Sequence, residues 1–245
     1  MNSRKIYENY LTVHYTGCES THFDNPDEVQ RLLQRNKLVL DHNLGSFFES
    51  KVKKTDEILD LGCGYGSFLN FLEFHGYTKA TGVDLSREEI KFCRQRFSKY
   101  QYSVADITRF VEKTQKKYKI IYLSHVLEHI PRMQTIKLLT GIKKIMADDA
   151  YLIVISPNSS AYFNSMATRY GDMTHETGFT NNSLHQLFNV LKFSEVQVLN
   201  YYGAGNSLIN VPRILALNIF EMFIQLLGYD KQNVYTPSLL LIAKK

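Results

Sequence analysis

The chain has 245 residues, of which 44% are hydrophobic and 22% are charged. These proportions match globular proteins and exclude a disordered or collagen-like chain. The net charge of +5 comes from scattered residues, so no nucleic-acid partner is expected. Three cysteines are too few for a disulfide framework, which favours a cytoplasmic location. No apolar run reaches the roughly 18 residues of a membrane-spanning helix, so no transmembrane segment is expected.

The chain divides into a front segment and a long alternating region. Residues 1–55 predict two or more helices that form an N-terminal cover, and residues 56–245 predict the main domain. The predicted strands of that domain are Ile58–Leu61, Ala80–Val83, Tyr102–Val104, Ile120–Leu123, Tyr151–Ile155, Val196–Tyr201 and Leu239–Ile242. The predicted helices are Ser67–His75, Arg87–Ser98, Pro131–Met146 and Asn181–Leu191, and Ser86 with Glu89 forms a capping box before the second. This alternation is typical of an α/β protein with a mostly parallel sheet and helices on both faces.

Residues 203–235 predict a helical insertion before the last strand. Within it, residues 212–227 form a helix that is apolar except for a narrow stripe of Asn218, Glu221 and Gln225. Such a helix packs against its own domain or against a second copy of the chain, which would make a homodimer. Binding to a membrane surface is the weaker alternative, because only Arg213 is basic there.

A glycine-rich segment follows the first predicted strand. Asp60 lies near the end of this strand, and Gly62, Gly64 and Gly66 come directly before a predicted helix. Glycines at a strand-to-helix turn let the backbone approach a ligand closely. A dinucleotide fingerprint would place its third glycine at residue 67, where the chain has serine. The spacing therefore disfavours a nicotinamide cofactor.

Two further acids follow the next two strands. Asp84 ends the second strand, where a carboxylate can accept hydrogen bonds from both hydroxyls of a ribose. Asp106 follows the third strand and could accept a hydrogen bond from an adenine amine. Because parallel strands end at one edge of a sheet, these acids and Asp60 should line one crevice.

From about Asp56 to Tyr201, the chain resembles class I S-adenosylmethionine-dependent methyltransferases, which carry the D-x-G-x-G-x-G loop and both later acids. The resemblance implies a Rossmann-like, doubly wound sheet of seven strands, with S-adenosyl-L-methionine as cofactor and S-adenosyl-L-homocysteine as product. It also implies a set of cofactor-binding residues. They are Asp60, Gly62, Cys63, Gly64 and Gly66 in the loop, Asp84 and Leu85 at the ribose, Asp106 and Ile107 at the adenine, and Ser124 after the fourth strand.

The segment Ser124–Pro131 contains the pattern H-x-x-E-H, but it leaves a strand and so does not fit the helix of a zinc protease. It resembles the V-L-E-H-I element of class I methyltransferases, which flanks the transferred methyl group. Relatives that act on quinols or RNA ends carry E-x-x-E-H there and use a divalent metal. This chain has His125 in place of the first glutamate, so a metal site stays open.

Residues 172–180, with the pattern D-x-T-H-E-x-x-F-T, resemble sugar and cell-surface-polysaccharide O-methyltransferases. The resemblance implies a sugar hydroxyl as acceptor. A hydroxyl needs a base, and we expect His175, oriented by Asp172, with His129 as the competing candidate. Two alternatives remain: a small-molecule or quinol O-methyltransferase assisted by a metal at Glu128 and His129, and a non-catalytic module that binds the cofactor.

Overall fold

The computed structural model describes residues 26–161, 165–203, 215–216, 219–220, 222–223, 225–227 and 234–245. The helices are α3 (Pro26–Lys51), α4 (Ser67–Phe74), α5 (Arg87–Arg96), α6 (Ile107–Lys113), α7 (Arg132–Ile145), α8 (Ser165–Tyr170) and α9 (Asn181–Val190), with a short 3-10 helix η1 (Leu127–His129). The strands are β1 (Ile58–Leu61), β2 (Ala80–Asp84), β3 (Gln101–Val104), β4 (Tyr118–Ser124), β5 (Met146–Pro157), β6 (Ser194–Tyr201) and β7 (Ser238–Lys244).

All seven strands form one sheet in the order β3-β2-β1-β4-β5-β7-β6. The first five strands pair in parallel, whereas β7 runs antiparallel to both β5 and β6. The predicted mostly parallel seven-stranded sheet is therefore confirmed. The strand order reverses between β1 and β4, which is where open α/β sheets bind ligands.

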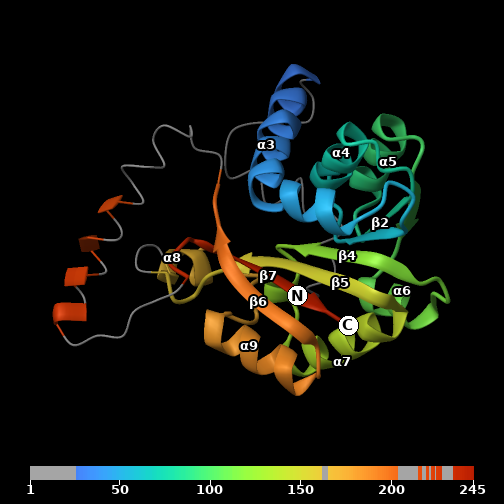
Figure 1. Cartoon of the computed structure of the whole chain (residues 1–245). Helices are drawn as coiled ribbons and strands as arrows, with labels where there is room; N and C mark the ends of the chain where they lie inside the picture. Colours follow the sequence, from blue (N-terminus) through green and yellow to red (C-terminus); the bar gives the residue numbers. More distant parts are fainter. Residues whose placement is uncertain are drawn as a thin grey trace.

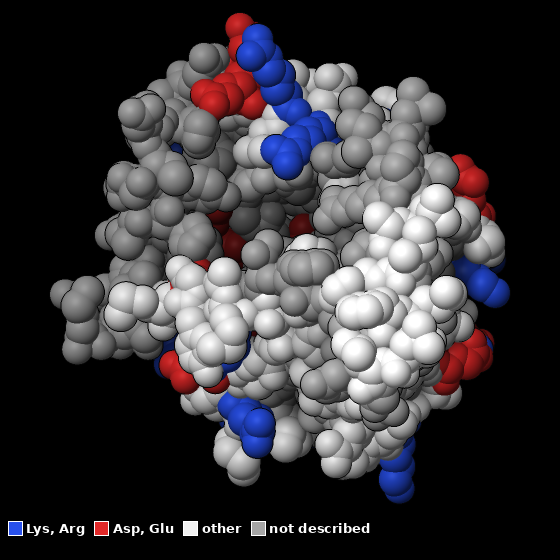
Figure 2. All heavy atoms as spheres, turned by 90° about the vertical axis from the view of Figure 1, so that its left-hand side faces the viewer, with Lys and Arg blue, Asp and Glu red and all other residues white. Residues whose placement is uncertain are grey.

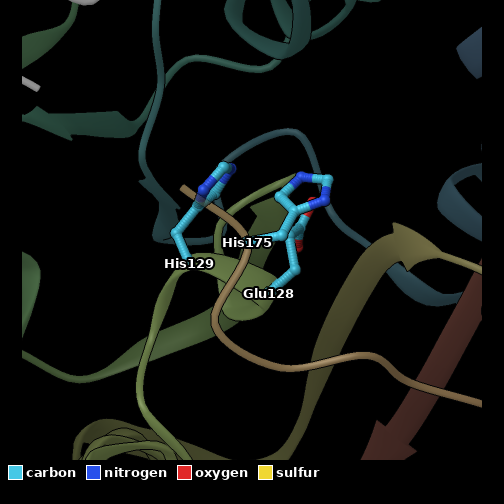
Figure 3. Close-up of side chains that lie close together, drawn as sticks. All are labelled: Glu128, His129 and His175. Atoms are coloured by element: carbon cyan, nitrogen blue, oxygen red, sulfur yellow. The ribbon is translucent and has the colours of Figure 1, made fainter. Parts of the chain in front are cut away.

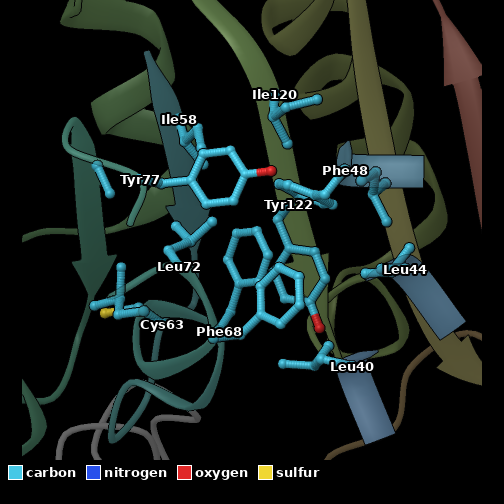
Figure 4. Packing of buried hydrophobic residues seen from close by; sticks show 14 of the residues in the cluster. Leu40, Leu44, Phe48, Ile58, Cys63, Phe68, Leu72, Tyr77, Ile120 and Tyr122 are labelled. Carbon is cyan, nitrogen blue, oxygen red and sulfur yellow. The ribbon is translucent and has the colours of Figure 1, made fainter. Parts of the chain in front are cut away.

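Helices cover both faces of this sheet, as predicted (Figure 1). One face packs against α3, α4 and α5, and the other packs against α6, α7 and α9. Figure 4 shows the first of these cores, where Phe68 of α4 stacks on Tyr122 of β4 at 3.9 Å between ring centroids. Phe48 of α3 meets Phe68 edge to face at 5.8 Å. The two cores hold rigid the strand ends that carry the candidate site.

The described part of the N-terminal cover is a single helix of 26 residues followed by residues 52–55, and residues 1–25 lie outside the described residues. Pro26 starts α3, and two acids, Asp27 and Glu28, lie in its first turn, as favoured at the positive end of a helix dipole. Its buried residues recur at helical spacing and join the core beneath α4; they are Val29, Leu33, Leu40, Leu44 and Phe48. This helix is thus an integral layer of the fold.

The insertion is described only in part, and residues 215–216, 219–220, 222–223 and 225–226 are helical. Most of their large apolar side chains are exposed, with 80% exposure at Leu226 and 64% at Met222, whereas Phe220 is half-buried. At Leu226 and Met222 the predicted packing against the domain is therefore not observed. Among the helices in the described ranges, none combines the length and the apolar character needed to span a membrane.

Candidate active site

The loop between β1 and α4 turns at three glycines. Gly62, Gly64 and Gly66 have φ angles of 78°, 49° and 86°, in the left-handed region that other residues rarely adopt. A Cβ at Gly62 would lie 2.3 Å from Cγ2 of Val126, and one at Gly66 would lie 2.6 Å from Cε2 of Phe97. Both positions therefore require glycine for steric as well as conformational reasons.

Backbone hydrogen bonds fix this loop against β2. The amides of Gly62 and Cys63 donate to the carbonyl of Val83 at 2.8 and 3.1 Å, and the amide of Gly66 donates to the carbonyl of Cys63 at 2.9 Å. The side chain of Cys63 is buried in the core, and the contact of this residue with a cofactor remains a prediction.

Asp60, at the third position of β1, is only 2% exposed, and its Oδ2 has no hydrogen-bond partner among the described residues. Burial, followed by the charge of Asp84, raises its pKa well above the usual value. A buried polar oxygen without a partner costs about 1–3 kcal/mol. An ammonium group such as that of the predicted cofactor would supply the missing donor, so the residues present fit that group.

Asp84, at the end of β2, links the glycine loop to α5. Its Oδ2 accepts a hydrogen bond from the amide of Gly64, and its Oδ1 accepts one from the amide of Ser86, both at 2.9 Å. The backbone of Leu85 and the side chain of Glu89 are also hydrogen-bonded to this carboxylate. The position is compatible with the predicted ribose contact, which remains a prediction.

Glu89 is a buried acid beside this link that the sequence analysis did not place in the site. Half of the predicted capping box is confirmed: the hydroxyl of Ser86 accepts from the Glu89 amide at 3.3 Å, whereas the amide of Ser86 donates to Asp84. The Glu89 side chain is hydrogen-bonded to Asp84, and its Oε1 lies 3.4 Å from the place of a Cβ at Gly64. Glu89 lies at helical spacing from Cys93 and Phe97, both of which are buried, and this spacing could have indicated that Glu89 is buried as well.

The buried pair makes folding stability depend on pH. Burial and the charge of Asp84 raise the pKa of Glu89 to about 8. We assign the proton to Glu89 because two backbone amides stabilise the charge of Asp84. The folded state then keeps a proton that the unfolded state releases above its ordinary pKa of 4.5, so stability falls as the pH rises from there toward about 8.

Glu89→Gln, which preserves the neutral form, should escape this loss. The difference in melting temperature, variant minus unmodified chain, should increase steadily from about pH 5 to about pH 8 and then stay constant. Thermal unfolding of both proteins in the same buffers measures the difference. A difference that stays constant across this range would contradict the assignment.

The other predicted cofactor contacts lie at the same edge of the sheet. Asp106 follows β3 and caps α6, because its Oδ1 accepts from the amide of Arg109 at 3.0 Å. Ile107 begins that helix, Leu85 follows β2, and Ser124 ends β4; all four predicted residues are half-buried. The structure therefore brings them to the strand ends that carry the glycine loop, and their contacts with a cofactor remain predictions.

The loop after β4 lies directly against the glycine loop. Val126 occupies the space that a side chain at Gly62 would need, and His129 follows three residues later in η1. The preceding residue, His125, has a φ of 54°. Donor and acceptor sides of the predicted reaction are thus adjacent in the fold.

Glu128 anchors the acceptor side. It is 2% exposed, its Oε2 accepts from the hydroxyl of Ser156 at 3.2 Å, and its Oε1 lies 3.2 Å from Nδ1 of His125. Burial alone would raise its pKa, but the hydrogen bond and charge of His125 outweigh it and lower the pKa. The backbone carbonyl of Glu128 also accepts from the amides of Glu176 and Thr177 at 2.8 and 2.9 Å. These two bonds fix the 172–177 loop against η1.

His129 is connected to Asp172 through Thr174. Nδ1 of His129 lies 2.9 Å from Oγ1 of Thr174, which in turn lies 2.6 Å from Oδ1 of Asp172. Burial lowers the pKa of His129, which favours a neutral ring at neutral pH. The orientation of His175 by Asp172 remains a prediction. In the structure, the side chain of Asp172 contacts the Thr174 hydroxyl, which in turn contacts His129.

His175 lies beside His129, with 4.9 Å between ring centroids and 58° between ring planes. Figure 3 shows both imidazoles beside the carboxylate of Glu128. One ligand atom from each of Glu128, His129 and His175 can be chosen so that all three lie within 4.8 Å of one another. The structure therefore assembles the predicted acceptor-side residues in one cluster.

One face of the molecule is hollowed. Figure 2 shows a depression whose bottom exposes acidic side chains, while basic side chains lie on the outer surface. Acids at the bottom of a depression favour a cationic ligand over a phosphate-bearing one.

Comparisons with known proteins give the family. The chain matches the family described as methyltransferase domain over residues 21–198. No curated protein matches it. It is similar to the solved structure of a SAM-dependent methyltransferase from Archaeoglobus fulgidus, with 22% identity, a TM-score of 0.64, and coverage of 85% of this chain and 94% of the other.

Two further solved structures share the fold. Magnesium protoporphyrin IX methyltransferase from Synechocystis PCC 6803, with bound SAH, is 12% identical with a TM-score of 0.61, and the match covers 100% of both chains. The plantazolicin methyltransferase BamL, in complex with a triazolic analog and SAH, is 15% identical with a TM-score of 0.58, covering 99% of this chain and 97% of that one. These likenesses establish the fold, and the family match spans well over half of the sequence. The chain therefore belongs to the methyltransferase-domain family.

Proposed function

We propose that this methyltransferase transfers the methyl group of S-adenosylmethionine to a hydroxyl of a sugar or glycan-type acceptor. One observation carries the proposal: the glycine loop, with its unpartnered Asp60, lies directly against the loop that carries His129. A cationic donor and a hydroxyl acceptor would then meet at one strand edge. The sugar acceptor is supported by the D-x-T-H-E pattern over residues 172–176.

The reaction balances as an in-line displacement. A lone pair of the acceptor oxygen forms the new bond to the methyl carbon, the carbon–sulfur bond breaks, and its electrons return to sulfur, which becomes a neutral thioether. The hydroxyl proton passes to a histidine of the acceptor cluster, His175 or His129, and then to water. Alignment at about 3 to 3.5 Å removes much of the entropic barrier, and the base contributes about 10² to 10⁴ in rate.

The direct test uses methyl-labelled S-adenosylmethionine with pooled acceptors: nucleotide sugars, oligosaccharides, sugar phosphates and quinols. Mass spectrometry should find the label on a hydroxyl of a saccharide. Calorimetry with S-adenosylhomocysteine, run in parallel, should show binding. If the label is found on a quinol, the acceptor is a quinol and not a saccharide. If S-adenosylhomocysteine binds but no acceptor is methylated, the result favours a non-catalytic module.

A second candidate is metal-assisted methylation of a small-molecule hydroxyl such as a quinol. The grouping of Glu128, His129 and His175 favours it, because two imidazoles and a carboxylate suit a transition-metal cation. A bound cation would supply positive charge that acidifies the acceptor hydroxyl. Loss of turnover on chelation, restored by added divalent metal, would select this candidate.

We also propose that the chain pairs with a second copy through the 212–227 helix. Several of the described apolar residues there are exposed on the single chain, including Ile219 at 59%, Met222 at 64% and Leu226 at 80%. Burying them between two copies would remove apolar surface from water. Light scattering should therefore give the mass of a dimer, and Leu226→Glu should shift it to that of one chain. An unmodified chain that is monomeric at about 100 μM would exclude the pairing.

A further inference from the structure

We propose that Thr174 and Asp172 are positioning residues that hold His129 in the tautomer with its proton on Nδ1, so that Nε2 of His129 receives the proton of the acceptor. This inference rests on the proposed function for the identity of the reaction. The assignment of the tautomer itself does not depend on which acceptor is methylated. It also decides between the two histidines that the sequence left as alternatives.

The first step is the proton on Nδ1 of His129. Two oxygens of Thr174 lie near this nitrogen, the backbone carbonyl at 3.3 Å and the hydroxyl at 2.9 Å. A carbonyl can only accept, so Nδ1 must donate for this contact to be favourable. The lone pair of the neutral ring is then on Nε2.

The second step is the direction of the Thr174 hydroxyl. Its Oγ1 lies 2.6 Å from Oδ1 of Asp172, and that oxygen also accepts from the Thr174 amide at 2.8 Å. A carboxylate accepts only, so the hydroxyl proton points to Asp172 and an oxygen lone pair faces His129. The chain of donors runs from Nδ1–H through O–H to a carboxylate, and each bond strengthens the next.

The third step is the rigidity of this arrangement. The loop that carries Asp172 and Thr174 is fixed to η1 by the amides of Glu176 and Thr177, which donate to the carbonyl of Glu128. Thr174, the hydrogen-bond partner of His129, is therefore held in place because its loop is bound to the backbone of Glu128, the residue that precedes His129.

The consequence is a base oriented through an intervening hydroxyl. A nucleophile is commonly activated by a base that a third group orients, and here two groups in series perform the orientation. His175 would then act as a neighbour of the base, since its backbone amide donates to the carbonyl of Asp172 at 3.2 Å and its ring packs beside His129.

Thr174→Val, which keeps the side-chain shape and removes the hydroxyl, should lower kcat by about 10- to 100-fold, a part of the full contribution of a base. KM and the affinity for S-adenosylhomocysteine should stay within about twofold of the unmodified chain. Thr174→Ser should restore most of the turnover. The matched control is Thr177→Val, which removes a loop hydroxyl bonded to the Ile130 carbonyl at 3.1 Å and should change kcat much less.

The tautomer is measured without turnover. Side-chain ¹⁵N NMR should show the proton of His129 on Nδ1 in the unmodified chain and a mixture of tautomers in Thr174→Val. A proton on Nε2 in the unmodified chain would overturn the inference, as would a larger loss of kcat in His175→Gln than in His129→Gln. If no acceptor is ever methylated, the proposed function fails while this spectrum still decides the tautomer.

Discussion

Gly62→Ala is expected to destabilise the fold by about 2–6 kcal/mol and to abolish measurable cofactor binding. The φ of 78° costs a non-glycine residue about 1–3 kcal/mol. The added Cβ would also lie 2.3 Å from Cγ2 of Val126, and such overpacking typically costs about 1–3 kcal/mol more. Denaturant unfolding and calorimetry with S-adenosylhomocysteine measure the two losses.

The double variant Gly62→Ala with Val126→Ala separates the two causes. Removing the valine methyl groups leaves the Val126 Cβ 3.6 Å from the new atom, which is an ordinary contact. About half of the lost stability should therefore return, while the cost of the left-handed backbone stays. If the single variant is as stable as the unmodified chain, the loop does not have the geometry described here.

Asp60→Asn is expected to separate stability from binding. The apo protein should keep or slightly gain stability, because the change removes a carboxyl group whose raised pKa reflects burial and the nearby charge of Asp84. The affinity for S-adenosylmethionine should fall by about 10- to 100-fold, which corresponds to losing a hydrogen bond to a charged group worth about 1.5–3 kcal/mol. Thermal unfolding without ligand and calorimetry with it give the two quantities.

Asp148→Asn is the matched control, since it makes the same change of charge at a fully exposed side chain. It should leave both stability and affinity close to those of the unmodified chain. Unaltered affinity in Asp60→Asn would show that this carboxyl group does not bind the donor. Severe unfolding of the ligand-free variant would show that its role is structural.

The strands were predictable because their burial produces a clear signal. β4, for example, is a short run of large apolar residues between polar segments, and it is buried on both faces of the sheet. The ends of the strands were less predictable. The predicted fifth strand begins at Tyr151, whereas β5 begins at Met146, because the residues after α7 pair with β4 through an irregular register. α6 escaped prediction because seven residues are too few to show helical periodicity.

The candidate site was predictable where its residues are close in sequence or at strand ends. The glycine loop and Asp84 follow from the order of strands and turns, and their proximity is confirmed by the bond from the Gly64 amide to Asp84. The link from His129 to Thr174 joins residues 45 positions apart, and it depends on how a loop approaches a short helix. No local pattern encodes such an approach, so the partner of His129 emerged only from the structure.

The attachment of the 172–177 loop has a consequence for how new specificities could arise on this scaffold. Two main-chain amides hold the loop to the Glu128 carbonyl, and these bonds do not depend on which side chains the loop carries. Met173, which precedes the tethered residues Glu176 and Thr177 in the loop, is fully exposed. A substitution at Met173 would change the side chain that the loop presents to an acceptor, while the backbone bonds of the loop stay in place. The specificity for the acceptor can therefore change without a change in the catalytic residues.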